Sequence, residues 1–558
     1  MKKCKLGFVI VVVLLLAGAN NAVRGEVITV PDDYPSIGEA VSNALPGDTI
    51  MVESGVYTED IRIDKRLTLE CEDVTLKGKI IVDAKNVKIS NIRIQDVVEA
   101  VEITSSGGAV LYSLSISNCT YGVKVERNGE VDIRSSSFEN CEYGVHGNKT
   151  KNIQVSGATF TNNINGLYFT EVHSSSVASS QIKNSTTGVY FTLSERVSIS
   201  KNVIEGCETG IELQETDGTI EDNFLKNDTN IKAESMDNST ISGNTIEGGT
   251  KGIILKYSSG NEIRANRIKN AGSWGIRIMY QSQDCKFYNN LLYNNKSGIE
   301  ALAGCDNTKI VNNTLYKNSK NIWIHDSKDI LIQNNIITKG DYGIYAQESN
   351  ATVNYNNFSK TPKPGYTTGI EIEKYNSFED PMFMDVENEN FKLDINSPCV
   401  DFGKLENSPG TDFEGKGRPY GEGVDLGAYE VTSAQITLIT NTVDYELADE
   451  FINFLDKNNV HINAISAEDF PEHQEDKIIV ILGGPDAYVG VGYIVQIALD
   501  PNEITLLRKE GNSAMFIKTN TWKDDQLILI LAGNDRDLTQ KASLENKEEV
   551  LSQIKEWT

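Results

Sequence analysis

Apolar residues alternate with polar ones in many short segments of this chain. Ile276 and Ile278 flank Arg277, and the segment 322–324 repeats the pattern around Trp323. A period of two places successive side chains on opposite faces of a β-strand, whereas an amphipathic helix shows apolar residues three and four positions apart. The pattern therefore predicts a chain built from short strands with one buried face each.

These strands recur at a nearly constant distance along the sequence. Each repeat begins with glycine or asparagine, followed by an aliphatic residue, a variable residue and usually another apolar one. Successive repeats are 20–26 residues apart, and most are 22 or 23 apart. A fixed period of this length indicates a solenoid, in which each coil buries its apolar face only by stacking on its neighbours. The repeats begin at Gly122, Gly144, Gly166, Gly188, Gly210, Asn230, Gly252, Gly275, Gly298, Asn321, Gly343 and Gly369.

A second column of the repeat is occupied by asparagine. Stacked strands lie about 4.8 Å apart, so identical side chains on successive coils align into ladders. We expect this column to form an amide ladder at a corner of the coil, where asparagine also tolerates the left-handed conformation. Ligand contact is the alternative reading of the same residues. The column comprises Asn202, Asn223, Asn244, Asn266, Asn290, Asn313, Asn335 and Asn357.

The repeats resemble the right-handed parallel β-helix family, the pectate-lyase-like fold, over residues 27–430. The entry segment is also similar to the N-terminal cap of such proteins: residues 37–41 begin a short amphipathic helix, and residues 46–69 alternate turns with short apolar runs. The resemblance implies an all-β right-handed parallel β-helix solenoid. It implies no particular chemistry, because this fold carries lyases, hydrolases, epimerases, adhesins and inert spacers.

The solenoid is predicted to end near residue 372, where the pattern changes twice. An acidic and aromatic stretch comes first. Beyond it, apolar strand-like runs alternate with amphipathic helices, which predicts a small α/β domain with a largely parallel sheet. The expected organisation is a signal peptide in 1–25, an N-terminal cap with the first coils in 26–75, repeats in 76–375, a C-terminal cap module in 376–432 and the α/β domain in 434–558.

Two further resemblances concern the C-terminal part. Residues 397–403, 412–419 and 424–430 resemble the module called choice-of-anchor Q, and we expect Phe402, Phe413 and Tyr429 to cover the last coil. Residues 482–487 and 531–536 resemble a module of archaeal cell-surface and S-layer-associated proteins. Gly483 and Gly484 could cradle an anion, but Pro485 removes a donor there, so a turn is the better interpretation.

The N-terminus has the pattern of a secretion signal. Lys2, Lys3 and Lys5 precede an apolar run over residues 8–19, and the small residues Ala22 and Gly25 offer cleavage positions. A retained membrane anchor is the alternative, although the run is short for a span. We expect a secreted protein associated with the cell surface.

The chain is strongly acidic, with a formal net charge of −27. This charge disfavours nucleic acid and anionic membranes as partners, and it also disfavours acidic polysaccharides. Neutral polysaccharides or cell-envelope glycans fit better, with surface-layer proteins as further partners; no cofactor is indicated, although calcium could bridge a contact. Sequons for N-glycosylation occur at Asn118, Asn148, Asn184, Asn227, Asn238, Asn295, Asn312, Asn350 and Asn357.

Two cysteines occupy equivalent positions on neighbouring coils. Cys119 and Cys141 are 22 residues apart, and adjacent coils bring Cα atoms within reach of a disulfide. A disulfide and a pair of buried thiols are both consistent with this spacing. The cysteine spacings resemble no metal site.

The outward side chains of the repeat strands supply the candidate binding site. Arg277, Glu300, Trp323 and Tyr345 share one outward column, and His325 belongs to the next. Aromatic rings stack on sugar rings while charged groups bond hydroxyls, so this patch is the best candidate for glycan binding. Any exposed sheet also tolerates aromatic residues, which is the structural alternative. Further candidates in the same column are Tyr168 and Tyr190.

No catalytic set is evident in the outward columns. Glycoside hydrolysis needs two carboxylates about 5–10 Å apart, and a lyase of the pectate type needs clustered calcium carboxylates with a basic residue. Glu300 has Arg277 and Trp323 on its two neighbouring coils and no second carboxylate. A non-catalytic surface protein that binds glycans or builds the envelope is therefore favoured, with a polysaccharide lyase or glycosidase as the alternative.

Overall fold

A computed structural model describes residues 25–367, 375–431, 434–458 and 460–557 of the chain. The predicted signal peptide lies outside these residues. The chain divides into two compact units, 1–232 and 233–558, which are described separately. None of the helices in the described part of the chain is long and apolar enough to span a bilayer.

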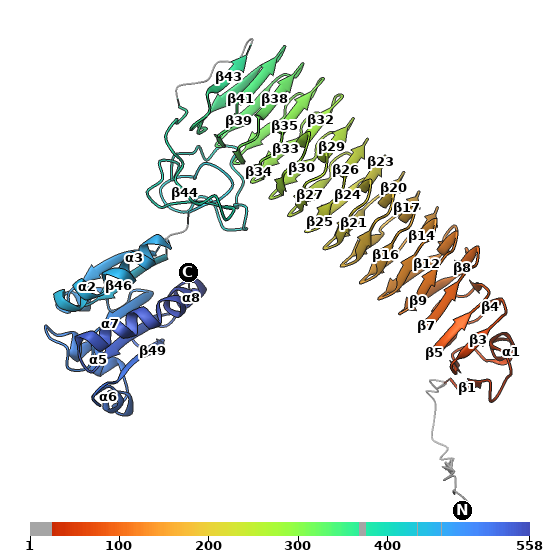
Figure 1. Ribbon diagram of the computed structural model, residues 1–558, viewed down its shortest axis with the longest axis horizontal. Helices are drawn as coiled ribbons and strands as arrows, with labels where there is room; N and C mark the ends of the chain where they lie inside the picture. The colour runs from red at the N-terminus through yellow and green to blue at the C-terminus, as the bar shows by residue number, and fades with distance from the viewer. Residues whose placement is uncertain (1–24, 368–374, 432–433, 459, 558) are drawn as a thin grey trace, which may run out of the picture. The chain divides into compact units, whose positions relative to one another are not determined.

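Both units contain stacked coils of a right-handed parallel β-helix, as the repeat predicted (Figure 1). One strand from each coil forms a parallel sheet that we call sheet 1. In the first unit, residues 22 positions apart face each other across this sheet, as Val123 faces Val145. Its strands there are β4 (Ile61–Ile63), β6 (Ile80–Val82), β8 (Glu99–Ile103), β11 (Tyr121–Val125), β14 (Tyr143–Asn148), β17 (Asn165–Thr170), β20 (Thr187–Thr192) and β23 (Thr209–Gln214).

The other strands of each coil form a second parallel sheet, which we call sheet 2. The entry helix α1 (Ile37–Asn43) precedes most of it, and Ser36 caps this helix by accepting the amide of Glu39. Sheet 2 of the first unit comprises β1 (Val27–Val30), β2 (Thr49–Val52), β3 (Gly55–Tyr57), β5 (Thr68–Leu76), β7 (Val87–Gln95), β9 (Gly108–Tyr112), β10 (Ser115–Ser117), β12 (Glu130–Arg134), β13 (Ser137–Glu139), β15 (Ile153–Ser156), β16 (Thr159–Thr161), β18 (Ser176–Ala178), β19 (Gln181–Lys183), β21 (Val197–Ser200), β22 (Val203–Glu205), β24 (Gly218–Glu221) and β25 (Phe224–Lys226).

The second unit repeats this arrangement, and β26 (Thr229–Glu234) contains the division between the units. Its sheet 1 comprises β29 (Lys251–Lys256), β32 (Trp274–Met279), β35 (Ser297–Leu302), β38 (Lys320–His325), β41 (Tyr342–Gln347) and β43 (Lys363–Thr367). Its sheet 2 comprises β27 (Thr240–Ser242), β28 (Thr245–Glu247), β30 (Glu262–Arg264), β31 (Arg267–Lys269), β33 (Lys286–Tyr288), β34 (Leu291–Tyr293), β36 (Lys309–Val311), β37 (Thr314–Tyr316), β39 (Ile330–Gln333), β40 (Ile336–Thr338) and β42 (Ala351–Asn354).

The last repeat differs from the prediction. Tyr345 faces Tyr366 and Ile344 faces Gly365, so Pro364 takes the place that the sequence assigned to Gly369. Gly369 lies outside the described residues. The glycine motif gave the wrong position because Pro364 stands where the other coils have glycine or asparagine. The glycine of this coil, Gly365, follows one residue later.

The asparagine ladder is present, with one member corrected. Asn290 Nδ2 donates to the Asn313 side chain at 2.9 Å and to the Ile263 carbonyl at 2.7 Å. Continuing the ladder, Asn335 donates to Asn356 rather than to Asn357. The left-handed residue of each corner is the one before the ladder asparagine, such as Asn289, Asn312 and Asn334. The ladder gives these buried amides partners, which is needed because an unpaired buried amide is costly.

The interior of the coils is apolar, as the alternation predicted. Ile276 and Ile278 are fully buried, while Arg277 between them remains partly exposed. In the first unit, Phe138 and Phe160 stack at 4.8 Å between ring centroids. Each inward position thus forms a continuous row across neighbouring coils, which is how a repeat too small to bury its own core becomes stable.

The segment after the coils begins on the last coil, where Ser377 pairs with Asn357, and then packs along the flank of sheet 2. It contains the antiparallel pair β44 (Phe383–Asp385) and β45 (Asn390–Leu393). Tyr293 and Tyr316 project from β34 and β37 and form a cluster with Phe391 and Tyr429. Phe402, which is predicted to cover the last coil, is 38% exposed. The outward tyrosines of sheet 2 offer the apolar surface that the segment needs, which explains the difference.

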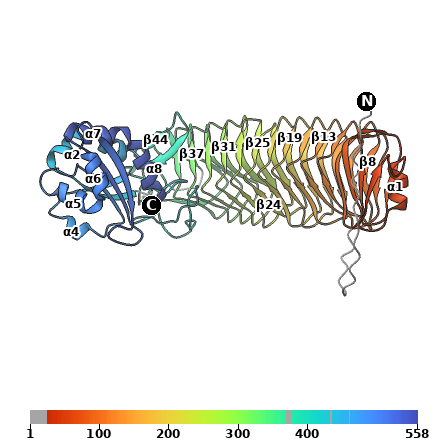
Figure 2. The ribbon, with the colours of Figure 1, turned by 90° about the horizontal axis from the view of Figure 1, so that it is seen from below.

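The C-terminal part is a small α/β domain, as predicted. Its sheet has the order β47-β46-β48-β50-β49, and β49 is the antiparallel strand. Figure 2 shows the helices of this domain around the sheet, among them α2, α5 and α7. Helices cover both faces, with Phe451 and Ile554 on one side and Ile494 and Leu507 on the other. The elements are β46 (Ala434–Ile439), α2 (Thr442–Leu447), α3 (Asp449–Lys457), β47 (Val460–Ile465), α4 (Phe470–His473), β48 (Ile478–Leu482), α5 (Val491–Ala498), α6 (Pro501–Leu507), β49 (Ser513–Thr519), β50 (Leu527–Gly533), α7 (Arg536–Glu545) and α8 (Lys547–Trp557).

Candidate functional site

Four of the sequence candidates lie side by side on sheet 1 of the second unit. Arg277 on β32 faces Glu300 on β35, which faces Trp323 on β38, which in turn faces Tyr345 on β41. His325 occupies the next outward column of β38, between Leu302 and Gln347 on the adjacent strands. The parallel register of the coils therefore assembles the patch that the sequence singled out.

Glu300 is committed to an ion pair. Arg277 Nε donates to Glu300 Oε2, and the Glu300 side chain is only 2% exposed while that of Arg277 is 19% exposed. The Arg277 guanidinium also lies 3.4 Å from the centre of the Trp274 ring. The covered carboxylate holds Arg277 in place on this face.

The aromatic side chains of the patch meet edge to face. The rings of Trp323 and Tyr345 are 6.1 Å apart at an angle of 88°. Lys320 Nζ lies 3.7 Å from the centre of the Trp323 ring and 4.3 Å from that of Tyr345. Such cation–π contacts are favourable, and they place a positive charge directly on the aromatic surface.

Sequence reasoning missed a third outward column, which contains Trp274, Ser297, Lys320, Tyr342 and Lys363. Each of these residues stands three positions before a residue that aligns with the first predicted column. In β32 and β38, the two residues that separate them along the strand are both buried. Strict alternation hides such a column. The polar or aromatic residue directly before the glycine or asparagine of each repeat was the sequence signal that could have revealed it.

Two indole groups of this face lack acceptors. The Nε1 atoms of Trp274 and Trp323 are buried and have no hydrogen-bond partner among the described residues. An indole N–H is a donor only, and burying it without an acceptor carries a cost. Because the two indole nitrogens are buried, the donors that this face presents to a ligand are the cationic side chains beside them.

The two tyrosines predicted in the first unit have a different environment. Tyr168 and Tyr190 stack with their centroids 4.6 Å apart and an angle of 16° between the rings, and His146 stacks on the other face of this row at 5.7 Å. Burial raises the pKa of Tyr190 and lowers that of His146. Because of this stacking, the Tyr168 ring is covered on both faces, by His146 and by Tyr190.

The paired cysteines are thiols in the structure. Cys119 and Cys141 are both buried and unbonded to another sulfur. A hydrogen bond between the two thiols lowers the pKa of Cys119 and, with burial, raises that of Cys141. The disulfide stays a prediction.

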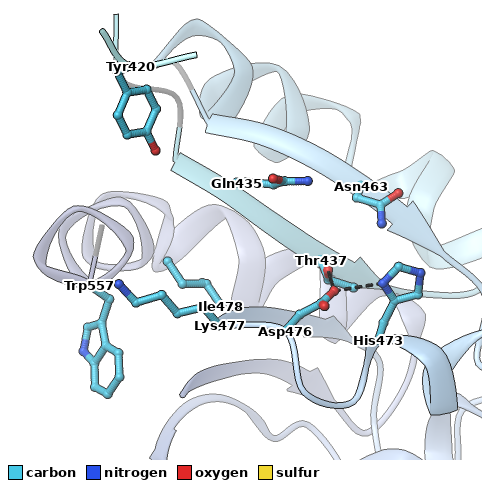
Figure 3. A pocket seen from close by; sticks show the side chains of 9 residues that line it. All are labelled: Tyr420, Gln435, Thr437, Asn463, His473, Asp476, Lys477, Ile478 and Trp557. Carbon is cyan, nitrogen blue, oxygen red and sulfur yellow. Dashed lines mark hydrogen bonds and ion pairs between the residues drawn. The ribbon is translucent and has the colours of Figure 1, made fainter. Parts of the chain in front are cut away.

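Sequence reasoning did not find the pocket of the α/β domain, which has a volume of about 340 Å³ (Figure 3). The Asp476 carboxylate accepts the Thr437 hydroxyl and lies 2.9 Å from His473 Nδ1. A nucleophile, base and orienting carboxylate would place the hydroxyl at the histidine. Here both side chains contact the carboxylate instead, so the cluster does not have that arrangement. Thr437 comes from a different segment of the chain than His473 and Asp476, and no local sequence motif marks the three residues.

In the described part of the chain, no three histidine, cysteine, aspartate or glutamate side chains come together as a metal site would require. Calcium, which the sequence left open, therefore has no identified set of ligands among these residues.

Comparison with known families matches the coils directly. The model of the periplasmic copper-binding protein family NosD matches residues 41–234 and 142–303, and the model of the right-handed beta helix region matches residues 301–380. The chain has the fold of the right-handed β-helix proteins. No curated protein matches it.

Several solved structures are similar to this β-helix protein at low identity. A mutant of the periplasmic alginate epimerase AlgG is 16% identical over 63% of this chain and 84% of that one, with a TM-score of 0.33. A mutant of the PL6 family alginate lyase AlyGC is 13% identical over 82% and 64%, with a TM-score of 0.39. DFA-IIIase from Arthrobacter chlorophenolicus is 12% identical over 64% and 98%, with a TM-score of 0.30. At such values we draw nothing about the site from these likenesses.

Proposed function

We propose that this protein acts outside the cytoplasm and binds polysaccharide on the outward face of sheet 1 in the second unit. One observation carries the proposal. Aromatic and cationic side chains from successive coils meet on this face, with Arg277 on Trp274 and Lys320 on Trp323. Sugar-binding surfaces combine such rings with groups that bond hydroxyls, and a row of coils offers them at regular intervals along a chain.

The location outside the cytoplasm is part of this proposal. The charged and apolar pattern of residues 1–25 supports export. The matched NosD family is described as periplasmic, which agrees with export. A role at the cell surface, alongside glycans or surface-layer proteins, rests on the resemblance of residues 482–487 and 531–536 to surface modules.

Replacing Trp323 by alanine tests the binding site. Retention of the Trp323→Ala variant on immobilised polysaccharides should fall, while its melting temperature stays close to that of the parent. Tyr112→Ala is the control, because Tyr112 is 48% exposed and lies on sheet 2 of the first unit. Equal retention of both variants, or no retention of the parent on any polysaccharide, would refute the proposed function.

A polysaccharide lyase or glycosidase is the second candidate. It is favoured by one observation, the Arg277–Glu300 pair on the same face as the aromatic rings. Incubation with a polysaccharide panel, with and without calcium, should then release reducing ends or unsaturated uronate. Glu300→Gln should abolish that release if Glu300 takes part. Products that persist in Glu300→Gln would place the chemistry elsewhere.

A further inference from the structure

Lys317, Lys339 and Lys360 form a row along the edge of sheet 1 in the second unit, and Lys296 lies two positions further along its own coil. Lysines stand in the turns that lead into β35, β38, β41 and β43, one on each of four successive coils. These turns border an open groove with a volume of about 710 Å³, whose lining includes four lysines and a single carboxylate, that of Asp341. The four lysines are Lys296, Lys317, Lys339 and Lys360, and all are exposed.

Two of these lysines are available to a ligand. Lys296 and Lys317 make no ion pair or side-chain hydrogen bond with any residue that the structure describes. Lys339 Nζ donates to the Tyr316 hydroxyl at 2.8 Å, which raises the pKa of Lys339, and Lys360 pairs with Asp380. The row therefore carries uncompensated positive charge in a chain whose overall charge is −27.

The face next to this groove offers hydrogen-bond donors in excess. Lys320 Nζ lies over the ring of Trp323, and the Arg277 guanidinium lies over the ring of Trp274. Glu300, the carboxylate in this column, is already paired with Arg277. A surface of donors selects a ligand rich in acceptors, and charge-assisted bonds to carboxylate or sulfate are the strongest it could make.

We propose that this lysine groove and the adjoining face bind a linear polysaccharide that carries carboxylate or sulfate groups. This inference rests on the proposed function and specifies its ligand. Successive coils repeat at about 4.8 Å, a distance similar to the length of one sugar unit in an extended chain. An acidic polysaccharide lying across the coils would therefore present about one anionic group to each lysine.

A polysaccharide fits this surface better than the other common polyanions. Duplex DNA and an anionic membrane are broad and would face the acidic remainder of the protein as well as the groove, which opposes binding. A single polysaccharide chain is narrow enough to contact the basic groove alone. The net charge of the chain therefore argues against large polyanions but not against this ligand.

The sharpest test compares one polymer with and without its charge. Binding of the full chain to dextran sulfate, polygalacturonate and neutral dextran is measured by isothermal titration calorimetry at two salt concentrations. Duplex DNA and vesicles with anionic lipid are measured in parallel. We expect dextran sulfate and polygalacturonate to bind, with affinity falling as salt rises, and we expect dextran to bind far more weakly.

Matched lysine variants then locate the contact. In the double variant Lys296→Gln, Lys317→Gln, the affinity for both acidic polymers should fall roughly tenfold or more. The control is Lys88→Gln, Lys201→Gln in the first unit. Both control lysines are exposed, and Lys201 has φ 56°, matching the φ of 57° at Lys317. Equal melting temperatures of the two double variants show that folding is unchanged.

The other possible results of these binding measurements each contradict a specific claim. Equal binding of dextran and dextran sulfate, or equal losses in the two double variants, overturns the acidic ligand and leaves polysaccharide binding standing. If no polysaccharide binds, the proposed function fails as well. If DNA or the vesicles bind as tightly as polygalacturonate, the groove is a general polyanion site and the assignment to polysaccharide is overturned.

Discussion

The Arg277 guanidinium pairs with Glu300 on the next coil, and the Glu300 carboxylate is almost completely covered although it projects from the outward face of the sheet. Breaking a buried pair leaves an unpaired charge. Glu300→Ala should therefore lower the free energy of unfolding by about 2–4 kcal/mol, measured by urea denaturation.

The double variant Arg277→Met, Glu300→Leu is the control for this pair. It removes both charges and keeps apolar bulk, so it should recover most of the loss seen in Glu300→Ala. A double variant that is less stable than Glu300→Ala would show that the two side chains do not act as a pair.

The asparagine ladder makes a second stability prediction. Asn313 accepts the amide of Asn290 at 2.9 Å and donates to the Phe287 carbonyl at 2.9 Å. Asn313→Ala leaves these buried groups unpaired and should cost about 2–3 kcal/mol in the free energy of unfolding. Ser198→Ala, at a partly exposed position of sheet 2, should change it by less than about 0.5 kcal/mol. Similar losses would contradict a structural role for the ladder.

A third prediction concerns pH. Asp425 accepts the amides of Val431 and Asp401, and burial together with nearby Glu430 raises the pKa of Asp425 to about 7. Burial also raises the pKa of Glu430. A carboxyl group whose pKa is raised on folding stabilises the fold when protonated, and this contribution is lost as the pH rises through the folded value.

The segment around these two carboxyl groups should consequently be more stable near pH 5 than near pH 8. Hydrogen exchange at the amides of Val431 and Asp401, corrected for the intrinsic pH dependence of exchange, measures this directly. Asp425→Asn carries no titrating group, so the difference between the two pH values should shrink. A larger stability at pH 8 would contradict the assignment.

The cysteines allow a fourth prediction. After mild oxidation of the purified protein, a peptide map under non-reducing conditions should contain a Cys119–Cys141 disulfide. Cys71 and Cys207 should remain thiols, because Cys71 faces Val52 across sheet 2 and the Cys207 amide donates to Asn227, so neither has a cysteine at that neighbouring position. Burial also raises their pKa to about 12 and about 11, which lowers their reactivity. Cys119 and Cys141 recovered as free thiols after mild oxidation would count against the disulfide.

Local alternation and the repeat period are enough to predict the coils and the direction of most of their side chains. Ile276 and Ile278 were assigned inward because strands alternate, and Arg277, Glu300 and Trp323 were aligned because coils stack in register. The final ladder position was wrong because two asparagines, 356 and 357, are adjacent, and the period alone does not choose between them. Trp274 was missed because the two residues after it are both buried, which breaks strict alternation.

Other features depend on where charges lie on the surface or on tertiary contacts, and the linear sequence pattern shows neither. The net charge pointed away from acidic polysaccharides because it averages over the whole chain, whereas Lys296 and Lys317 lie together on successive turns. The cluster of Thr437, His473 and Asp476 forms only when β46 packs beside β48. The commitment of Glu300 to Arg277 likewise depends on side-chain conformations in neighbouring coils.

The central claim is that polysaccharide binds on sheet 1 of the second unit. Hydrogen-exchange mass spectrometry of the full chain, with and without whichever of dextran sulfate and polygalacturonate binds more tightly, tests it most directly. The account predicts added protection in β32, β35, β38 and β41 and in the turns that contain Lys296 and Lys317. Protection confined to the α/β domain or to the first unit, with these strands unchanged, would contradict it.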